Sequence, residues 1–259
     1  MQFAHLAWRG RPLRLEYEWV GEPAAPAPPV VFLHEGLGSI AMWREFPSTF
    51  CSDNGLRGLV FSRNGYGRST PKPPDEHWAV DFMHTQAHEV LPMLLQQLGI
   101  ERPWLFGHSD GASIALLHAA RFDVAGVIAV APHLFVEDVS IASIEKARDA
   151  YETTDLRERL ARYHDDPDSA FRGWNDAWLD PKFRDWNIEA EIATIRCPVL
   201  AVQGEDDEYG TLAQIHAIAR RLPKTRLLVI PKCGHSPHRD RPELLAAEAA
   251  RFILDPPPS

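Results

Sequence analysis

The sequence predicts an α/β protein with a mostly parallel sheet of eight strands, flanked by helices and interrupted by a helical insertion. The chain has 259 residues, 45% of them hydrophobic, which is enough for one large core. Short apolar runs without alternation recur along it, as is typical of strands buried on both faces of a parallel sheet. Helical patterns lie between these runs, and this alternation favours an α/β fold with right-handed crossovers.

The predicted strands fall into two groups. Residues 13–20 alternate between apolar and polar side chains, so we expect a half-exposed strand that pairs antiparallel with a similar one at residues 3–8. Residues 22–29, rich in Pro and Ala, form a connecting loop. The six buried strands are predicted at residues 30–33, 58–61, 104–106, 127–130, 199–202 and 227–230.

Helical patterns of two lengths accompany the strands. The longer ones, which belong to the main domain, occupy residues 80–98, 112–121, 211–222 and 242–253. Two shorter ones occupy residues 147–151 and 156–160. The chain ends in a Pro-rich segment, residues 255–259, for which we expect a frayed end.

The alternation of strands and helices stops after residue 134 and resumes at residue 196. The stretch between them is charged, helical and rich in aromatic residues. We therefore expect residues 135–195 to form a helical cap on a core made of residues 1–134 and 196–259. The alternative is that this stretch adds two exposed helices to the main domain.

Composition excludes several classes of partner. The net charge of −9 and the lack of a basic stripe argue against a nucleic-acid partner. Three widely spaced cysteines, Cys51, Cys197 and Cys233, are typical of ordinary buried thiols in a reducing compartment. The N-terminal residues lack a signal-peptide pattern, and no apolar run approaches membrane length. We expect a cytoplasmic protein without a membrane partner, and the sequence does not indicate its oligomeric state.

The motif Gly-His-Ser-Asp-Gly at residues 107–111 is the strongest indication of function. It fits the pattern G-x-S-x-G and lies between a predicted strand and a predicted helix. Small residues two before and two after the serine permit a sharp, strained turn that exposes its hydroxyl. The spacing places Ser109, and not Asp110, at the nucleophile position. The alternative is a surface loop rich in Gly and Ser.

A serine hydroxyl needs a base within hydrogen-bond reach, and the base needs an orienting acid. His235 follows the last predicted strand directly, where open α/β sheets place site residues, and His238 is its competitor. The run Glu-Asp-Asp-Glu at residues 205–208 follows another predicted strand and offers four carboxylates. The motif alone leaves the choice between Asp206 and Asp207 open.

The negative oxygen of an acyl-transfer transition state needs preorganised donors. We expect the backbone N–H of Asp110 to be one, and the glycine-rich loop at residues 34–39 to supply the other. His84 and His88 form an i, i+4 pair that could bind a metal ion, but no third ligand is evident. We therefore expect neither a metal nor a cofactor.

Five motifs in order resemble those of the α/β-hydrolase superfamily, and the resemblance covers nearly the whole chain. They are residues 34–39 (oxyanion loop), 62–69 (the loop after the next strand), 107–111 (nucleophile elbow), 204–207 (Gly-x-x-Asp) and 234–237 (Gly-His-x-Pro). The resemblance implies the α/β-hydrolase fold with a helical cap, Asp207 as the triad acid, and Gly36 as the loop donor with Leu37 as the fallback. Glu35 departs from the family pattern, which usually has Gly there. Its side chain either points away as a structural or solvated group, or it places a carboxylate near the substrate, which would disfavour anionic leaving groups.

The resemblance implies a serine hydrolase that cleaves a small or medium carboxylic ester, a thioester or a lactone through an acyl-enzyme. C–C bond hydrolysis, a non-catalytic ligand receptor and a metal hydrolase are the alternatives. The partner we expect is a small-molecule acyl substrate. We expect the substrate to contact Leu37 and His108, and Trp174, Trp178 and Trp186 either line its pocket or only pack the cap.

Overall fold

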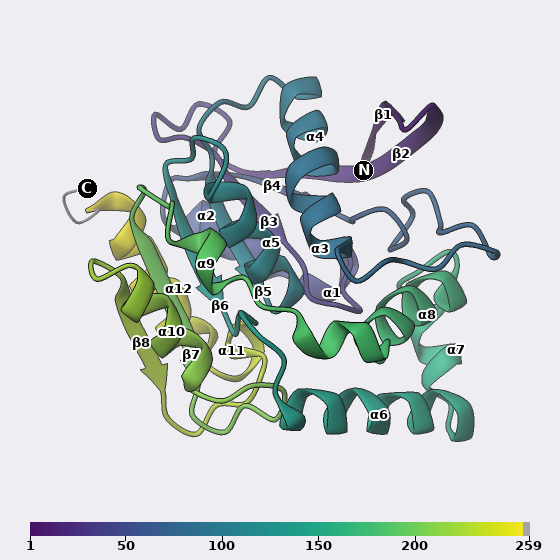
Figure 1. Cartoon of the computed structure of the whole chain (residues 1–259). Coiled ribbons are helices and arrows are strands. Elements are labelled where there is room, and N and C mark those ends of the chain that lie inside the picture. The colour runs from purple at the N-terminus through teal and green to yellow at the C-terminus, as the bar shows by residue number, and fades with distance from the viewer. Residues whose placement is uncertain (256–259) are drawn as a thin grey trace.

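The computed structural model describes residues 1–255 and contains one eight-stranded sheet. The strand order is β1-β2-β4-β3-β5-β6-β7-β8, antiparallel from β1 to β4 and parallel from there on (Figure 1). This confirms the predicted fold class. The strands are β1 (Gln2–Trp8), β2 (Arg11–Gly21), β3 (Val30–Leu33), β4 (Arg57–Phe61), β5 (Trp104–His108), β6 (Gly126–Val130), β7 (Val199–Gly204) and β8 (Arg226–Ile230).

The central strands are buried on both faces, which explains their continuous apolar runs. Val31 and Leu33 of β3 belong to one core cluster, whereas Val30 and Phe32 belong to another on the opposite face. The edge strand β8 differs from the prediction for residues 227–230. Its side chains alternate because Leu228 and Ile230 pack on the cluster that contains Phe32, whereas Leu227 and Val229 point to the opposite face and are exposed.

Helices cover both faces of the sheet. The cluster that contains Phe32 includes side chains of α2 (Phe46–Asp53) and α12 (Pro242–Leu254). The other cluster includes side chains of α5 (Asp110–Ala119) and α10 (Ala213–Arg221). A short helix, α1 (Ile40–Trp43), follows β3.

The helix predicted at residues 80–98 is built from three consecutive segments. These are α3 (Phe82–Thr85), a π-helical turn (Gln86–Val90) and α4 (Leu91–Gln97). Pro92 lies in the first turn of α4 and has no N–H to donate to the preceding turn. The proline therefore accounts for the local change of hydrogen-bonding pattern.

Helices fill the chain between β6 and β7. They are α6 (Asp138–Thr153), α7 (Leu156–Leu160), α8 (Pro167–Trp178), a 3-10 helix (Pro181–Asp185) and α9 (Glu189–Ile192). The helices α6, α7 and α8 lie together beside the sheet (Figure 1). In contrast, α9 packs against α5 and α10 of the main domain. No helix in residues 1–255 is long and apolar enough to cross a membrane, and all but the first residue of the predicted frayed end lies outside this range.

Candidate active site

The turn between β5 and α5 holds Ser109 in a strained backbone conformation, with φ 55° and ψ −122°. Its N–H donates to the carbonyl of Val130 at 2.9 Å, which ties the turn to the neighbouring strand β6. The two flanking glycines are required by space. A Cβ on Gly107 would collide with the backbone of α5, and one on Gly111 would collide with the carbonyl of Leu33. These contacts explain the small residues of the sequence motif.

Three predicted residues meet at this turn. The Nε2 atom of His235 lies 2.9 Å from the Oγ of Ser109, and its Nδ1 lies 2.8 and 2.9 Å from the two carboxylate oxygens of Asp207. A carboxylate only accepts, so Nδ1 carries the proton and Nε2 accepts from the serine hydroxyl. The competing residues lie elsewhere. His238 packs against the rings of Trp43 and His108, and Asp206 is exposed.

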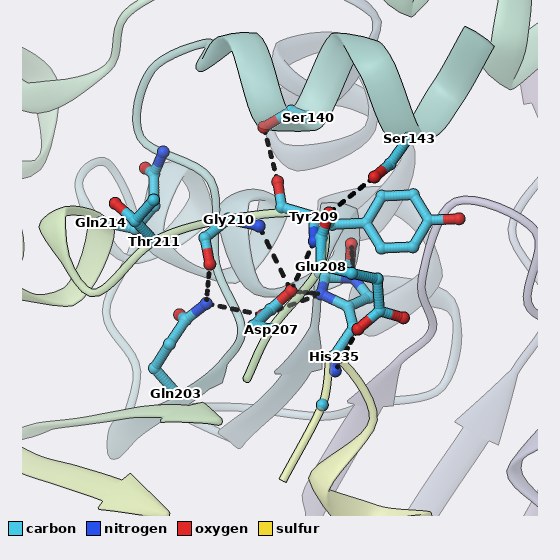
Figure 2. A network of polar contacts seen from close by, with 12 residues as sticks. Ser140, Ser143, Gln203, Asp207, Glu208, Tyr209, Gly210, Thr211, Gln214 and His235 are labelled. Carbon is cyan, nitrogen blue, oxygen red and sulfur yellow. Dashed lines mark hydrogen bonds and ion pairs between the residues drawn. The ribbon is translucent and has the colours of Figure 1, made fainter. Parts of the chain in front are cut away.

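Asp207 is held by neighbours from its own loop and strand. It accepts hydrogen bonds from the side chain of Gln203 at 2.6 Å and from the backbone N–H groups of Tyr209 at 2.8 Å and Gly210 at 3.2 Å (Figure 2). Burial opposes ionisation, but the hydrogen bond and charge of His235 outweigh it and lower the pKa of Asp207. Burial likewise opposes protonation of His235, yet Asp207 raises the pKa of His235 above its usual value.

Helix α6 anchors the loop that carries Asp207. The hydroxyls of Ser140 and Ser143 donate to the carbonyls of Tyr209 and Glu208, each at 2.6 Å (Figure 2). Glu208 in turn accepts the backbone N–H of His235 at 3.1 Å. Helix α6 therefore helps to fix the position of Asp207 relative to His235, which the sequence motifs did not indicate.

The peptide bond between Glu35 and Gly36 is oriented by three donors. The carbonyl oxygen of Glu35 accepts from Arg63 Nη2 at 2.8 Å, from His34 Nδ1 at 2.7 Å and from the N–H of Gly38 at 3.1 Å. His34 Nε2 accepts the backbone N–H of Arg63 at 3.0 Å, which leaves the proton of His34 on Nδ1. Because C=O and N–H point in opposite directions across a trans peptide, the Gly36 N–H points away from all three donors.

Helix α8 contacts both backbone segments predicted to bind the oxyanion. The indole of Trp174 packs so closely on Gly36 that a Cβ there would collide with it. One turn later, Trp178 Nε1 donates to the buried carboxyl of Asp110 at 3.1 Å. Burial raises the pKa of Asp110 to about 6, so this carboxyl group gains or loses its proton close to neutral pH.

A cavity of about 160 Å³ opens at Ser109. The predicted contact residues Leu37, His108, Trp174 and Trp178 line it. Trp186 does not: it stacks on Phe183 and meets the ring of His84, so this part of the prediction is corrected. An aromatic residue in a helical segment can pack against neighbouring helices or line a pocket, and the sequence pattern does not distinguish these two roles.

Sequence reasoning missed several residues of the cavity wall. They include His133, Ile144 and Tyr209. His133 follows β6, and its place at the carboxyl end of a parallel strand was a usable signal. Burial lowers the pKa of His133 to about 3, so it lines the cavity as a neutral imidazole. Ile144, on α6, has no sequence signal of this kind.

Glu35 lines the cavity as well, and two basic side chains face its carboxylate. Its oxygens lie 3.5 Å from His108 Nδ1 and 3.8 Å from Arg239 Nη2. His108 Nε2 donates to the backbone carbonyl of His235 at 2.7 Å, so the same imidazole contacts the loop that carries His235 and also lies near Glu35. Only 17% of the Glu35 side chain is exposed, so a mostly buried carboxylate lies in the loop at residues 34–39.

The i, i+4 histidine pair makes ordinary packing contacts. His84 Nε2 lies 2.9 Å from a carboxylate oxygen of Glu191, and His88 Nε2 lies 3.2 Å from the carbonyl of Leu117. Across residues 1–255, no group of three or more His, Cys, Asp or Glu side chains is arranged to hold a metal ion.

Comparison with known proteins agrees with this geometry. The chain is 26% identical over 263 residues to RutD of Caulobacter sp. (strain K31), provisionally named a carbamate hydrolase, covering 92% of this chain and 95% of that protein. It is 24% identical over 212 residues to the bifunctional esterase/perhydrolase DCH of Acinetobacter calcoaceticus, covering 70% and 75%. The structure resembles a thermophilic esterase from Thermogutta terrifontis with a TM-score of 0.74 and 19% identity, covering 98% of each chain. The profile of the alpha/beta hydrolase family matches residues 30–248, and the chain is therefore a hydrolase of this family.

Proposed function

We propose that this hydrolase cleaves small or medium carboxylic esters, and related thioesters or lactones, through an acyl-enzyme on Ser109. The observation that carries the proposal is the unbroken hydrogen-bonded chain from Ser109 through His235 to Asp207. In this arrangement the Ser109 hydroxyl donates to the nitrogen that has to receive its proton, and Asp207 holds that imidazole in place through the opposite nitrogen.

In the proposed reaction, His235 takes the proton of Ser109 as the serine oxygen attacks the substrate carbonyl carbon. The resulting oxyanion accepts the backbone N–H groups of Gly36 and Asp110. The protonated His235 then gives its proton to the departing alcohol or thiol, and the C–O or C–S bond breaks. A water molecule, deprotonated by His235, attacks the acyl carbon and releases the acid and Ser109. Asp207 orients His235 and stabilises its cation throughout.

The substrate size follows from the cavity at Ser109. A volume of about 160 Å³ has room for a short acyl group, and the walls of Trp174, Trp178 and Ile144 favour an apolar one. We expect kcat/KM on a series of p-nitrophenyl esters to peak at acetate to butyrate and to fall at longer chains. Steady-state rates across the series provide the test. An optimum at long acyl chains would contradict the assignment of this cavity as the acyl site.

The pKa of His235 determines the expected pH dependence. His235 must be neutral to accept the serine proton, and Asp207 raises its pKa above the usual 6.5, so kcat/KM should rise with pH through a window that lies above 6.5. Asp207→Asn should shift this window to lower pH and reduce kcat by about three to four orders of magnitude.

Asp206→Asn is the matched control, since it removes one carboxylate from the same loop at an exposed position. It should leave both the window and kcat close to those of the wild type. If the two variants behave alike, Asp207 is not the acid that orients His235.

A further inference from the structure

A second cavity, of about 350 Å³, lies between the inserted helices and the main domain. It is called the arginine groove below. Its floor is formed by Met42, Leu156, Leu160 and Tyr163. Its charged side chains are all basic, although the whole chain carries a net charge of −9. The four arginines of the groove are Arg44, Arg159, Arg162 and Arg239.

The arginine groove has more positive charge than its neighbours neutralise. Arg159 lies 3.2 Å from Asp155, and Arg239 lies 3.8 Å from Glu35. Arg44 and Arg162 form no ion pair with any residue between 1 and 255. Two guanidinium groups are thus available to an anion. A guanidinium group forms bidentate hydrogen bonds with carboxylate and phosphate oxygens.

Arg44 also holds an uncommon backbone conformation. It ends α1 with φ 53° and ψ −138°, a region that favours glycine. Such a conformation costs about 1 kcal/mol or more and persists where the surrounding structure holds it. Arg44 lines the groove together with Arg159 and Arg162 of the insertion.

The arginine groove adjoins the catalytic cavity. Arg239 follows His235 by four residues, and Glu35, which Arg239 faces at 3.8 Å, lines the cavity at Ser109. Tyr163, another residue of the groove, precedes His164, whose Nε2 donates to the carbonyl of Leu37 at 3.0 Å. Leu37 also lines the cavity at Ser109. Two residues of the groove therefore lie next to residues that contact the cavity wall.

We propose that the arginine groove binds an anionic group, a carboxylate or a phosphate, on the leaving-group part of the substrate. This inference rests on the proposed esterase function and deepens it. The anion meets Arg44 and Arg162, while the carbon skeleton that connects it to the ester lies on the apolar floor of Leu156 and Tyr163. The charge of Glu35 is offset in part by Arg239, which faces it at 3.8 Å.

The test uses acetate esters that share one acyl group and differ in the charge of the leaving group. 4-Acetoxybenzoate carries a carboxylate, 4-acetoxyphenyl phosphate carries a phosphate, and methyl 4-acetoxybenzoate is neutral. The readout is the ratio of kcat/KM for each charged ester to that for the neutral ester. This ratio is measured in the wild type, in Arg44→Gln/Arg162→Gln, and in Arg121→Gln, which removes an exposed arginine outside the groove.

We expect the double variant to lower the ratio roughly tenfold relative to the wild type, mostly through KM, while Arg121→Gln leaves the ratio unchanged. Added salt should lower the wild-type ratio as well. The charged ester with the larger ratio, carboxylate or phosphate, carries the preferred anion.

An equal ratio in the wild type and the double variant would overturn the inference. So would a wild-type preference for the neutral ester that salt does not change. Both outcomes leave hydrolysis of neutral esters at Ser109 intact, whereas loss of activity on every ester would contradict the proposed function instead. If the double variant does not fold, Arg162→Gln alone serves, because Arg162 has ordinary backbone geometry and an exposed side chain.

Discussion

Replacing Ser109 with alanine is expected to lower kcat for ester hydrolysis by several orders of magnitude, about 10³ or more, without disturbing the fold. The substitution removes one hydroxyl whose hydrogen bond is made to His235. The backbone contact of residue 109 with Val130 does not depend on the side chain. Rates on p-nitrophenyl acetate, together with labelling by a fluorophosphonate probe, measure the effect.

The two measurements separate an enzyme from a protein that uses the same cavity for binding alone. Wild-type protein should react with the probe and Ser109→Ala should not. Ser52→Ala, an exposed serine of α2, is the control and should keep both labelling and activity. Retention of most of the esterase activity in Ser109→Ala would show that another group is the nucleophile.

Mild acid is expected to unfold the protein because several histidines are buried in the neutral form. Burial lowers the pKa of His118 and of His164 to about 4 and that of His133 to about 3. In the unfolded chain these groups have a pKa near 6.5 and bind protons first. Stability is therefore complete above that pH and is lost as the pH falls through the interval down to about 4.

The expected loss of folding free energy in mild acid is large for a domain of this size. At a pH of about 5, each of these histidines destabilises the folded state by about 2 kcal/mol, or about 6 kcal/mol together. The free energy of unfolding of a domain is about 5–15 kcal/mol, so the destabilisation by these histidines is of comparable size. His235 and Asp110, whose pKa values are raised, contribute with the opposite sign.

Urea-unfolding midpoints from tryptophan fluorescence, at pH values of about 7.5, 6 and 5, provide the measurement. His118→Asn should reduce the dependence on pH, because an amide keeps a donor for the carbonyl of Ala87 but does not titrate. His5→Asn changes an exposed histidine of β1 and should not reduce it. Midpoints that coincide at pH 7.5 and 5 would contradict the role of the buried imidazoles.

The sequence predicted those features that a short segment encodes by itself. Ser109 could be found because its two glycines and its position between a strand and a helix are local requirements of one turn. His235 and the acidic loop at residues 205–208 could be found because they follow strands, and parallel strands end at a common edge. The choice of Asp207 over Asp206 came from the resemblance to the α/β-hydrolase superfamily. The edge position of β8 could not be found in this way, since an apolar run does not reveal whether it has one neighbour or two.

Other features depend on contacts between segments far apart in the chain. Trp174 and Trp186 look alike in sequence, yet one packs on Gly36 and the other on Phe183. Ser140 and Ser143 hold the acid loop across more than sixty residues of chain, as their hydrogen bonds show. No periodicity or motif encodes such approaches, because they arise when separate elements are packed together.

What the sequence predicts and what only the folded structure shows differ for a physical reason. Hydrophobic periodicity and the placement of glycine specify strands, helices and one sharp turn, and these were enough to predict the fold class and to point to Ser109. The orientation of the Gly36 N–H by Arg63 and His34, and the meeting of Arg44 with Arg162 in one groove, result from side-chain packing between distant segments. The position of Ser109 could therefore be predicted from the amino-acid order, whereas the surroundings of the cavity and of the groove became visible only in the folded structure, because they form when distant segments pack together.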